Sequence, residues 1–485
     1  MTLPLLSLII FLPLASAALL WLLPGRLARW VVAVSQLLTL LLSTAALLAY
    51  VPAGAPFQLS ERVLWIASLN IHYLVAVDGL SVLFLPATAL LFLGSLVASW
   101  NRVADAPRLH YSLLLLLQTA TLGIFCALDT LLFFTFWELA LVPLYFLLGR
   151  WGATAASPQV AARYFLIMLA SGIPLLIAFV LLAASQPQPT FDLIALLAVP
   201  LPASTQTAVF LLCLLGFAFK VPLVPLHTWL PQLALAAPGS LTALLVGLKL
   251  SAYGLIRFAI PLAPNAAQDM HWLLAGLGTV SLLYGAVGML GQSNLRVALA
   301  YASICHVGLA VLGLASFTAT GVQGAVSLLL SFSVASGGAF LLLEFLRQRT
   351  GSTDLNTLGG AAKTMPLLAS GFLICGLAGV GMPGTSSFPG EFMLILAALN
   401  SHTGAGMAAL FGLSIAAGAF LALYRKAFFG PVLRAEVAQA EDLRPREWLV
   451  LLALIAMVVI IGVYPGPWID LVRASAEAWA AGLAR

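Results

Sequence analysis

Fourteen apolar segments, each long enough to cross a bilayer as a helix, follow one another along this chain of 485 residues. Only 8% of the residues are charged, whereas a soluble domain carries about 25%. The chain therefore cannot cover a water-facing surface, which excludes a soluble enzyme, a disordered protein and a nucleic-acid-binding protein. We predict an all-α polytopic membrane protein. Its segments start near Leu3, Trp30, Ala76, Tyr111, Thr130, Tyr164, Thr207, Ser240, His271, Val297, Gly321, Met365, Gly404 and Trp448.

The basic residues alternate between the loops. Fifteen of the 21 Lys and Arg residues fall in odd-numbered loops, among them Arg296, and only Arg62 and Arg257 fall in even-numbered loops. Because Lys and Arg are enriched in cytoplasmic loops, the odd loops are predicted to be cytoplasmic and both termini periplasmic. The first apolar segment lacks a basic region before it, so we interpret it as a spanning helix and not as a signal peptide.

Five ionisable residues fall within the apolar segments, on five different predicted helices: Glu138, Lys220, Lys249, His306 and Glu391. A charge near the bilayer centre costs about 2.5–3.5 kcal/mol on insertion scales and is usually functional. Taken singly, His306 fits a hydrogen-bonded core histidine, and Glu138 with Lys220 fits a static ion pair. Five such groups at similar depth favour a path for ions, since buried ion pairs add little net stability.

The other polar residues have plainer interpretations. We expect Asp78, Asp129 and Asp192 near the outer interface, and Glu344 paired with Arg347 one helical turn away. The four cysteines lie in apolar runs without metal-binding spacing, so we expect neither a metal site nor a disulfide.

Two segments are interrupted, the seventh at residues 220–225 and the twelfth at residues 381–390, where Pro and Gly gather. Lys220 and Glu391 are 171 residues apart, and Glu138 and His306 are 168 apart. Both spacings fit two five-helix repeats, helices 4–8 and 9–13, the second inverted because five is odd; coincidence is the alternative. Inverted repeats with broken helices are typical of ion transporters. The predicted parts are residues 1–110, 111–262, 263–430 and 431–485.

Several motifs resemble the antiporter-like subunits of respiratory complex I. The family's fifth-helix glutamate motif is similar to Trp137-Glu138-Leu-Ala-Leu-Val-Pro143, and its eighth-helix lysine segment to Lys249-Leu-Ser-Ala-Tyr-Gly. Three further stretches resemble its broken helices and tenth helix: Lys220-Val-Pro-Leu-Val-Pro-Leu-His227, Ala300-Tyr301-Ala-Ser-Ile-Cys-His306 and Gly381-Met-Pro-Gly-Thr-Ser-Ser-Phe-Pro-Gly-Glu391. One member of this family has glutamate at the twelfth-helix position, where its relatives usually have lysine. Glu391 and the short tail after Pro465 favour a resemblance to that member.

The chain departs from this family at three places. Gln232 to Pro238 holds no ionisable group where acidic residues and histidine are usual. The frequent eleventh-helix histidine falls within Ser331-Phe332-Ser333, so a serine hydroxyl or water is expected to replace it. Asn294 stands where aspartate is common.

The resemblance implies a proton-translocating subunit of an NADH:quinone oxidoreductase, in a bacterial inner membrane. In that mechanism Glu138, paired with Lys220, sets the protonation of Lys249, and His306 relays protons to Glu391. The secondary candidates are His227, Tyr301, Ser331 and Ser333. No cofactor is expected in this chain; FMN, iron–sulfur clusters and quinone belong to partner subunits. The expected partners are other antiporter-like subunits, a peripheral redox arm and the lipid bilayer.

Three other functions fit the same residues. The chain could belong to a multisubunit cation/proton antiporter exchanging sodium, or to a membrane hydrogenase or inorganic-carbon uptake complex. It could also be a passive scaffold in a membrane arm. The interior Lys and His, and the lack of an oxygen-ligand cluster suited to a hard cation, favour protons over sodium.

Overall fold

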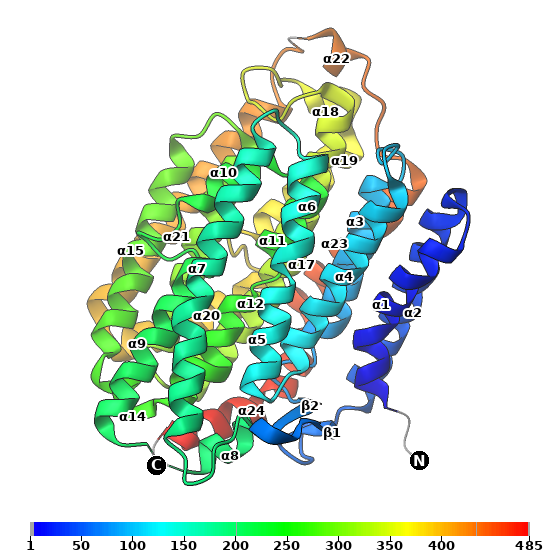
Figure 1. Cartoon of the computed structure of the whole chain (residues 1–485). Helices are drawn as coiled ribbons and strands as arrows, with labels where there is room; N and C mark the ends of the chain where they lie inside the picture. The colour runs from blue at the N-terminus through cyan, green and yellow to red at the C-terminus, as the bar shows by residue number, and fades with distance from the viewer. Residues whose placement is uncertain (1–3, 200, 433, 484–485) are drawn as a thin grey trace.

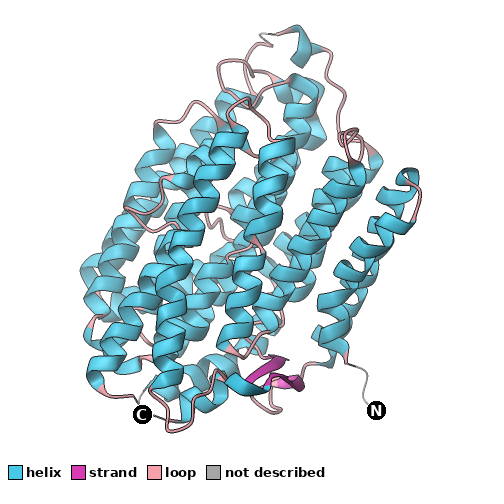
Figure 2. Ribbon diagram, viewed as in Figure 1, coloured by secondary structure: helices cyan, strands magenta, loops and turns pink. Residues whose placement is uncertain are grey.

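The computed structural model describes residues 4–199, 201–432 and 434–483. It is a bundle of helices that run mostly along one direction, with one β-hairpin at an end of the bundle (Figures 1 and 2). Both chain ends lie at that same end, which we call the termini face. The short helices α18 (Ala361–Thr364) and α22 (Ala435–Ala438) mark the opposite face. The predicted all-α membrane class is confirmed.

Twelve described helices, some of them built from consecutive elements, are long and apolar enough to cross a membrane. Their elements are α1 (Leu5–Leu22), α2 (Ala28–Ala49), α4 (Pro107–Cys126), α5 (Thr130–Leu139), α6 (Leu141–Trp151), α7 (Ser157–Ala184), α9 (Ala203–Lys220), α11 (Gly239–Gly247), α12 (Leu250–Gly254), η3 (Leu255–Ala259), α13 (Ile260–Leu262), α15 (His271–Leu290), α16 (Leu295–Leu314), α17 (Ala319–Thr350), α21 (Thr403–Phe428) and α23 (Pro445–Val463).

The remaining two of the fourteen predicted segments coincide with shorter helices. These are α3 (Phe84–Ser99), and α19 (Pro366–Ala378) followed by α20 (Ser387–Ser401). Every predicted segment thus has a helix, while length and composition alone identify twelve spans. The total of fourteen crossings stays a prediction.

Two elements at the termini face have no counterpart among the predicted segments. The hairpin pairs β1 (Gln58–Ile66) with β2 (Ile71–Val77), antiparallel. Helix α24 (Gly466–Leu483) lies across the same end of the bundle (Figure 1). It buries Val472, Ala476, Trp479 and Leu483, which recur at helical spacing on one side. The other short elements are η1 (Gly25–Leu27), η2 (Ala67–Leu69), α8 (Leu193–Ala198), α10 (Trp229–Ala236) and α14 (Pro264–Asp269).

The two predicted interruptions are present, and a third accompanies them. Helix α9 ends at Lys220 and α10 begins at Trp229, while α19 ends at Ala378 and α20 begins at Ser387. The third break separates α11 from α12 at Leu248 and Lys249. Backbone groups freed at such breaks need protein or water partners, because lipid offers none.

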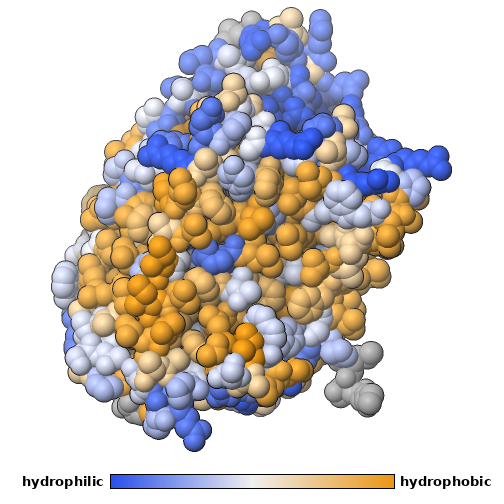
Figure 3. Space-filling model, viewed as in Figure 1, coloured by the Kyte–Doolittle hydropathy of each residue, from blue (hydrophilic) through white to orange (hydrophobic). Residues whose placement is uncertain are grey.

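Helix α17 is the buried centre of the bundle. It is 32 residues long, and 94% of its most apolar window is buried inside the chain. It packs against α16, α11, α20 and α19. On the visible surface a broad hydrophobic band crosses the molecule, and hydrophilic residues gather toward the opposite face (Figure 3). This distribution is the one expected for a protein that spans a bilayer.

A buried carboxylate on α17 joins three parts of the chain near the opposite face. Glu344 is 1% exposed and accepts hydrogen bonds from Arg102 at 2.5 Å and Arg347 at 3.1 Å. Its other oxygen accepts the backbone N–H of Gly239, the first residue of α11, at 2.7 Å. The predicted contact with Arg347 is confirmed, but it is one part of a larger cluster. The negative charge also complements the positive end of the α11 dipole.

Two basic residues expected in loops are buried in helices. Arg257 lies in the π-helical segment η3, where it forms an ion pair with Asp78 and donates to the Tyr253 hydroxyl at 3.0 Å. Both partners of the ion pair are almost fully buried within the chain, and Asp78 directly follows β2 at the termini face. Arg296 lies in the first turn of α16 and is 2% exposed. Arg257 lies in an apolar stretch that gives no sign of a loop, whereas Arg296 follows the polar stretch Gly291-Gln292-Ser293-Asn294 and lies only one residue inside the start of α16.

Replacing Glu344 should destabilise the fold. Glu344→Gln keeps the shape of the side chain but removes the counter-charge of Arg102 and Arg347, whose side chains are 42% and 16% exposed; we expect a loss of about 1–3 kcal/mol, the value for hydrogen bonds to a charged group. We expect less subunit in the assembled complex and a lower thermal unfolding temperature. Glu436→Gln, at the exposed pair with Arg434, is the matched control and should change neither quantity. Equal stability of both variants would contradict a structural role for the cluster.

Candidate functional site

Lys220 is held by the residue that precedes Glu138. Its ammonium lies 3.6 Å from the centre of the Trp137 ring and donates to the Trp137 carbonyl oxygen at 3.2 Å. Lys220 is also the last residue of α9, where a positive charge is stabilised by the helix dipole. The structure does not bring Glu138 into direct contact with Lys220. Both carboxylate oxygens of Glu138 are buried without a hydrogen-bond partner among the described residues.

Lys249 occupies the third helix break, directly before α12. Its ammonium donates to the hydroxyl of Ser303 on α16, and the side chain is 8% exposed. A cavity of about 60 Å³ is lined by Lys220, Lys249 and Ser303 together with apolar neighbours. This volume has room for roughly four water molecules. The two lysines can therefore be joined by water, and Ser303 extends that polar group toward α16.

His306 and Glu391 form a second polar group. The Nε2 atom of His306 lies 3.3 Å from a Glu391 carboxylate oxygen, and both side chains are buried. The Nδ1 atom is 2.7 Å from the Ala302 carbonyl oxygen, so this nitrogen carries a proton and donates. The second nitrogen is then free to exchange a proton with the carboxylate. The predicted neighbourhood of His306 and Glu391 is present in the structure.

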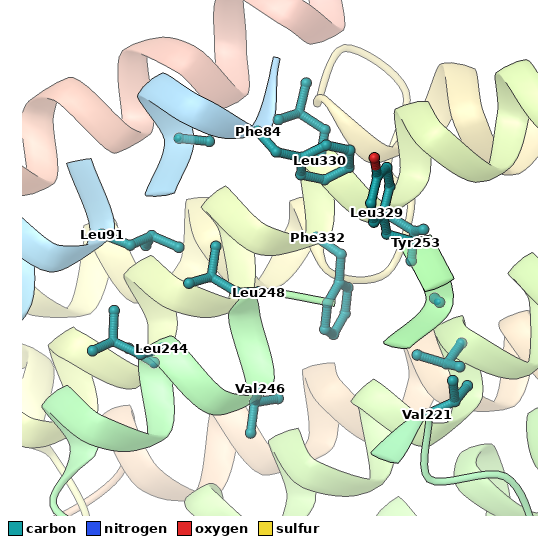
Figure 4. Close-up of a cluster of buried hydrophobic side chains, with 14 of the residues drawn as sticks. Phe84, Leu91, Val221, Leu244, Val246, Leu248, Tyr253, Leu329, Leu330 and Phe332 are labelled. Atoms are coloured by element: carbon teal, nitrogen blue, oxygen red, sulfur yellow. The ribbon is translucent and has the colours of Figure 1, made fainter. Parts of the chain in front are cut away.

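The ring of Phe332 contacts both polar groups. The Lys249 ammonium is 4.7 Å from the centre of this ring, and the centre of the His306 ring is 4.8 Å away, inclined by 30°. Phe332 is 2% exposed and reaches from α17 toward the break after Leu248 (Figure 4). An aromatic hydrocarbon ring has no group that accepts or donates a proton. In the sequence, this position stands out only because the family's frequent eleventh-helix histidine is absent here.

The serines beside Phe332 have a different role from the one expected. Ser331 donates to the Ser386 carbonyl oxygen at 2.7 Å, at the end of the α19–α20 break. Ser333 donates to the Gly247 carbonyl oxygen at 2.7 Å, at the end of α11. Each hydroxyl proton is thus engaged by a backbone group freed where a helix stops. These contacts do not support replacement of the absent histidine by a hydroxyl.

The other secondary candidates, His227 and Tyr301, both lie close to the ring of Tyr284. The ring of Tyr284 lies 4.7 Å from that of His227 and 6.1 Å from that of Tyr301. His227 is buried and follows the break after Lys220, while Tyr301 is partly buried on α16. The structure therefore groups these two with Tyr284, beside the row of lysines, histidine and glutamates.

A glycine lies against each glutamate. A Cβ atom at Gly172 on α7 would overlap the Glu138 carboxylate, and one at Gly381 would overlap the Glu391 carboxylate. Gly381 also has φ of +68°, a conformation that side chains rarely adopt. Both glutamates therefore occupy space that only glycine leaves open.

Chemically, the site is a set of buried titratable side chains that lie mainly at helix breaks. Two lysines, a serine and a water-sized cavity form one part, and an imidazole with a carboxylate forms the other. Within the described residues, no group of three or more His, Cys, Asp or Glu could hold a metal ion. The fold and this row define a polytopic helical membrane protein with interrupted spans and titratable groups inside them.

A family model described as NADH:quinone oxidoreductase/Mrp antiporter, transmembrane, matches residues 127–416. The chain belongs to this family. It is 32% identical to NADH-quinone oxidoreductase subunit M of Rhodobacter capsulatus, over 97% of this chain and 95% of the relative. It is 34% identical to subunit M of Pseudomonas aeruginosa, over 93% and 91%. The family expected from the motifs agrees with these relatives.

Solved structures extend the comparison. A chain of respiratory complex I from Thermus thermophilus matches with a TM-score of 0.91 and 33% identity, covering 99% of both chains. A chain of the Mrp complex from Dietzia matches with a TM-score of 0.86 at 23% identity, covering 99% and 98%. At that identity the second likeness shows a shared fold. The family predicted from the motifs is confirmed.

Gly381→Ala should separate His306 from Glu391. The added methyl group displaces the carboxylate, and the backbone at positive φ costs about 1–2 kcal/mol. Gly384→Ala is the matched control, because Gly384 has φ of +87° but open space around a Cβ. Cryo-electron microscopy of the assembled complex should show the Glu391 carboxylate moved away from His306 in the first variant alone. An unchanged distance between the two side chains in Gly381→Ala would contradict this geometry.

Proposed function

We propose that the chain is the proton-translocating membrane subunit, of the subunit M type, of an NADH:quinone oxidoreductase. The arrangement of buried proton carriers in two groups supports this proposal most strongly. Lys220, Lys249 and Ser303 line one cavity, and His306, whose ring packs against Phe332, contacts Glu391. Such groups are costly in an apolar interior unless function requires them. The subunit M relatives support the kind of complex.

In this mechanism, protons move along the row in steps. A proton on Lys249 passes into the water-sized cavity or to Ser303, and the loss of charge is favoured by the apolar surroundings. The proton reaches His306 only when water passes the Phe332 ring. Because His306 keeps its Nδ1 proton on Ala302, Nε2 accepts the arriving proton and gives it to Glu391. Glu138 acts on Lys220 through space, since the two are not in contact.

Energy comes from redox chemistry in partner subunits, and this chain itself carries out none. The expected FMN, iron–sulfur clusters and quinone lie in those partners, and the chain binds no cofactor. The partners are other antiporter-like subunits and a peripheral redox arm. We place the chain in a bacterial inner membrane, with the termini face periplasmic. The basic residues of the odd loops support this orientation.

The two interrupted spans support the internal repeat. Lys220 ends α9 before one break, and Glu391 lies in α20 just after the other. We propose inverted repeats over residues 111–262 and 263–430, preceded by residues 1–110 and followed by residues 431–485. In an inverted pair, a group at the end of one half-helix and a group at the start of the other reach the same depth.

The fold alone does not separate this function from that of a cation/proton antiporter. The Mrp complex of Dietzia and the archaeal membrane-bound sulfane sulfur reductase share the fold at 23% and 22% identity. The 33% identity to the Thermus complex I chain favours the respiratory complex. Purification from the native membrane distinguishes the respiratory complex from the antiporter. For the respiratory complex, we expect a flavin-containing NADH dehydrogenase arm to co-purify. Antiporter subunits without a redox arm would overturn the assignment.

Neutral replacements should uncouple this subunit. For Lys249→Met and Glu391→Gln, we expect proton transfer through the chain to slow by at least about a hundredfold, the usual contribution of a proton carrier. Protons pumped per electron should fall in proteoliposomes, while the complex still assembles. Lys363→Met changes an exposed lysine and should leave pumping unchanged. Full pumping by both Lys249→Met and Glu391→Gln would contradict the proposal. Failure of the complex to assemble with these variants would support a structural role for the two residues.

The Phe332 ring should limit passage between the two polar groups. Phe332→Ala leaves a cavity that water can enter, so we expect a proton leak across proteoliposomes in the absence of NADH. Phe332→Leu keeps an apolar side chain at the position and should not leak. Tight membranes with Phe332→Ala would show that the ring does not block the route.

A further inference from the structure

Two histidines meet on the termini face, away from the row of buried carriers. His271 is the first residue of α15, and His402 lies between α20 and α21. The Nδ1 atom of His271 is 2.8 Å from the Nε2 atom of His402, and the ring centres are 5.0 Å apart. The Nδ1 atom of His402 lies 3.0 Å from the Ser401 hydroxyl. No part of the proposed proton route uses this pair.

The pair presents two ring nitrogens toward one point. When His402 donates from Nδ1 to Ser401, its Nε2 holds a lone pair, and His271 donates a proton to it. A zinc ion can take the place of that shared proton, which moves to the Nε2 atom of His271 so that both rings bind the metal as neutral imidazoles. Zinc–nitrogen bonds of about 2.0–2.1 Å in tetrahedral geometry place two nitrogens roughly 3.4 Å apart. The rings need to separate by only about half an ångström.

The surroundings suit a zinc ion that also binds water. The pair lines a hollow of about 450 Å³ together with Ser316, Ser401 and Gln268. This space admits the water molecules that complete a four-coordinate shell. Among the described residues that line the hollow there is no carboxylate, whereas hard cations such as Ca²⁺ need several oxygen ligands. The Ser401 contact orients His402, as hydrogen bonds to the outer nitrogen of a zinc-binding histidine commonly do.

The hollow lies at the ends of the two helices that carry the second group of proton carriers. Ser316 follows the end of α16, ten residues after His306, and Ser401 ends α20, ten residues after Glu391. Ten helical residues span about 15 Å. Both helices therefore lead from the His306–Glu391 contact to the rim of this hollow.

We propose that His271 and His402 form a Zn²⁺ site on the termini face, and that bound Zn²⁺ slows proton passage at this end of α16 and α20. The slowing rests on the proposed function, whereas the binding does not.

The test uses the assembled complex with Zn²⁺ alone as the probe. Equilibrium binding should show one Zn²⁺ site fewer, or at least tenfold weaker, in the double variant His271→Asn/His402→Asn than in the unmodified complex. His72→Asn removes a histidine of the hairpin on the same face and should keep the site. In proteoliposomes, Zn²⁺ on the termini side should slow pumping in the unmodified complex and in His72→Asn, and have at least tenfold less effect on the double variant.

The outcomes separate the two claims. Unchanged Zn²⁺ binding in the double variant overturns the site, whatever pumping does. Zn²⁺ binding that depends on the pair but leaves pumping unaffected overturns its link to α16 and α20. Loss of pumping in the double variant without Zn²⁺ assigns the histidines to the proton route itself and also overturns the metal site as the explanation.

Discussion

A helix that stops inside a bilayer exposes carbonyl and amide groups that lipid cannot satisfy, and the rest of this structure depends on how that constraint is met. At the break after α9, the Trp229 indole donates to the Phe219 carbonyl oxygen at 2.8 Å. Ser331 and Ser333 do the same at the other two breaks. With these groups bonded, the bundle can keep polar space in its interior, and Lys220, Lys249 and Glu391 lie beside it.

The positions of the broken helices explain which features the sequence could predict. Lys220 and Glu391 stand next to Pro and Gly clusters, which stop helices through known backbone preferences. Lys249 lies between two leucines, with Gly247 before them, and nothing local signals a break there. That break depends on α17, whose Ser333 hydroxyl donates to the Gly247 carbonyl oxygen. A tertiary contact of this kind is not encoded in either segment alone.

The candidate site likewise contains residues that the sequence could predict and residues that it could not. Rarity of charge in an apolar chain identified all five central residues, because each carries a solvation cost that stands out from its neighbours. Phe332 and Trp137 were not predicted as site residues, since aromatic residues are common in spanning helices. Only their contacts with Lys249, His306 and Lys220 give them meaning. Arg257 was misplaced for the converse reason, because its partner Asp78 is 179 residues away.

Helix α11 is a short rigid connection between the Glu344 cluster and the helix break at Lys249. At its start, the Gly239 amide is fastened to Glu344, which in turn holds Arg102 and Arg347. At its far end, about 15 Å away, the chain reaches Lys249. A nine-residue helix is too short to bend appreciably, so any shift of the arginine cluster near the opposite face is carried to the backbone of Lys249. The depth of the Lys249 ammonium inside the bundle thus depends on the arginine cluster near the opposite face.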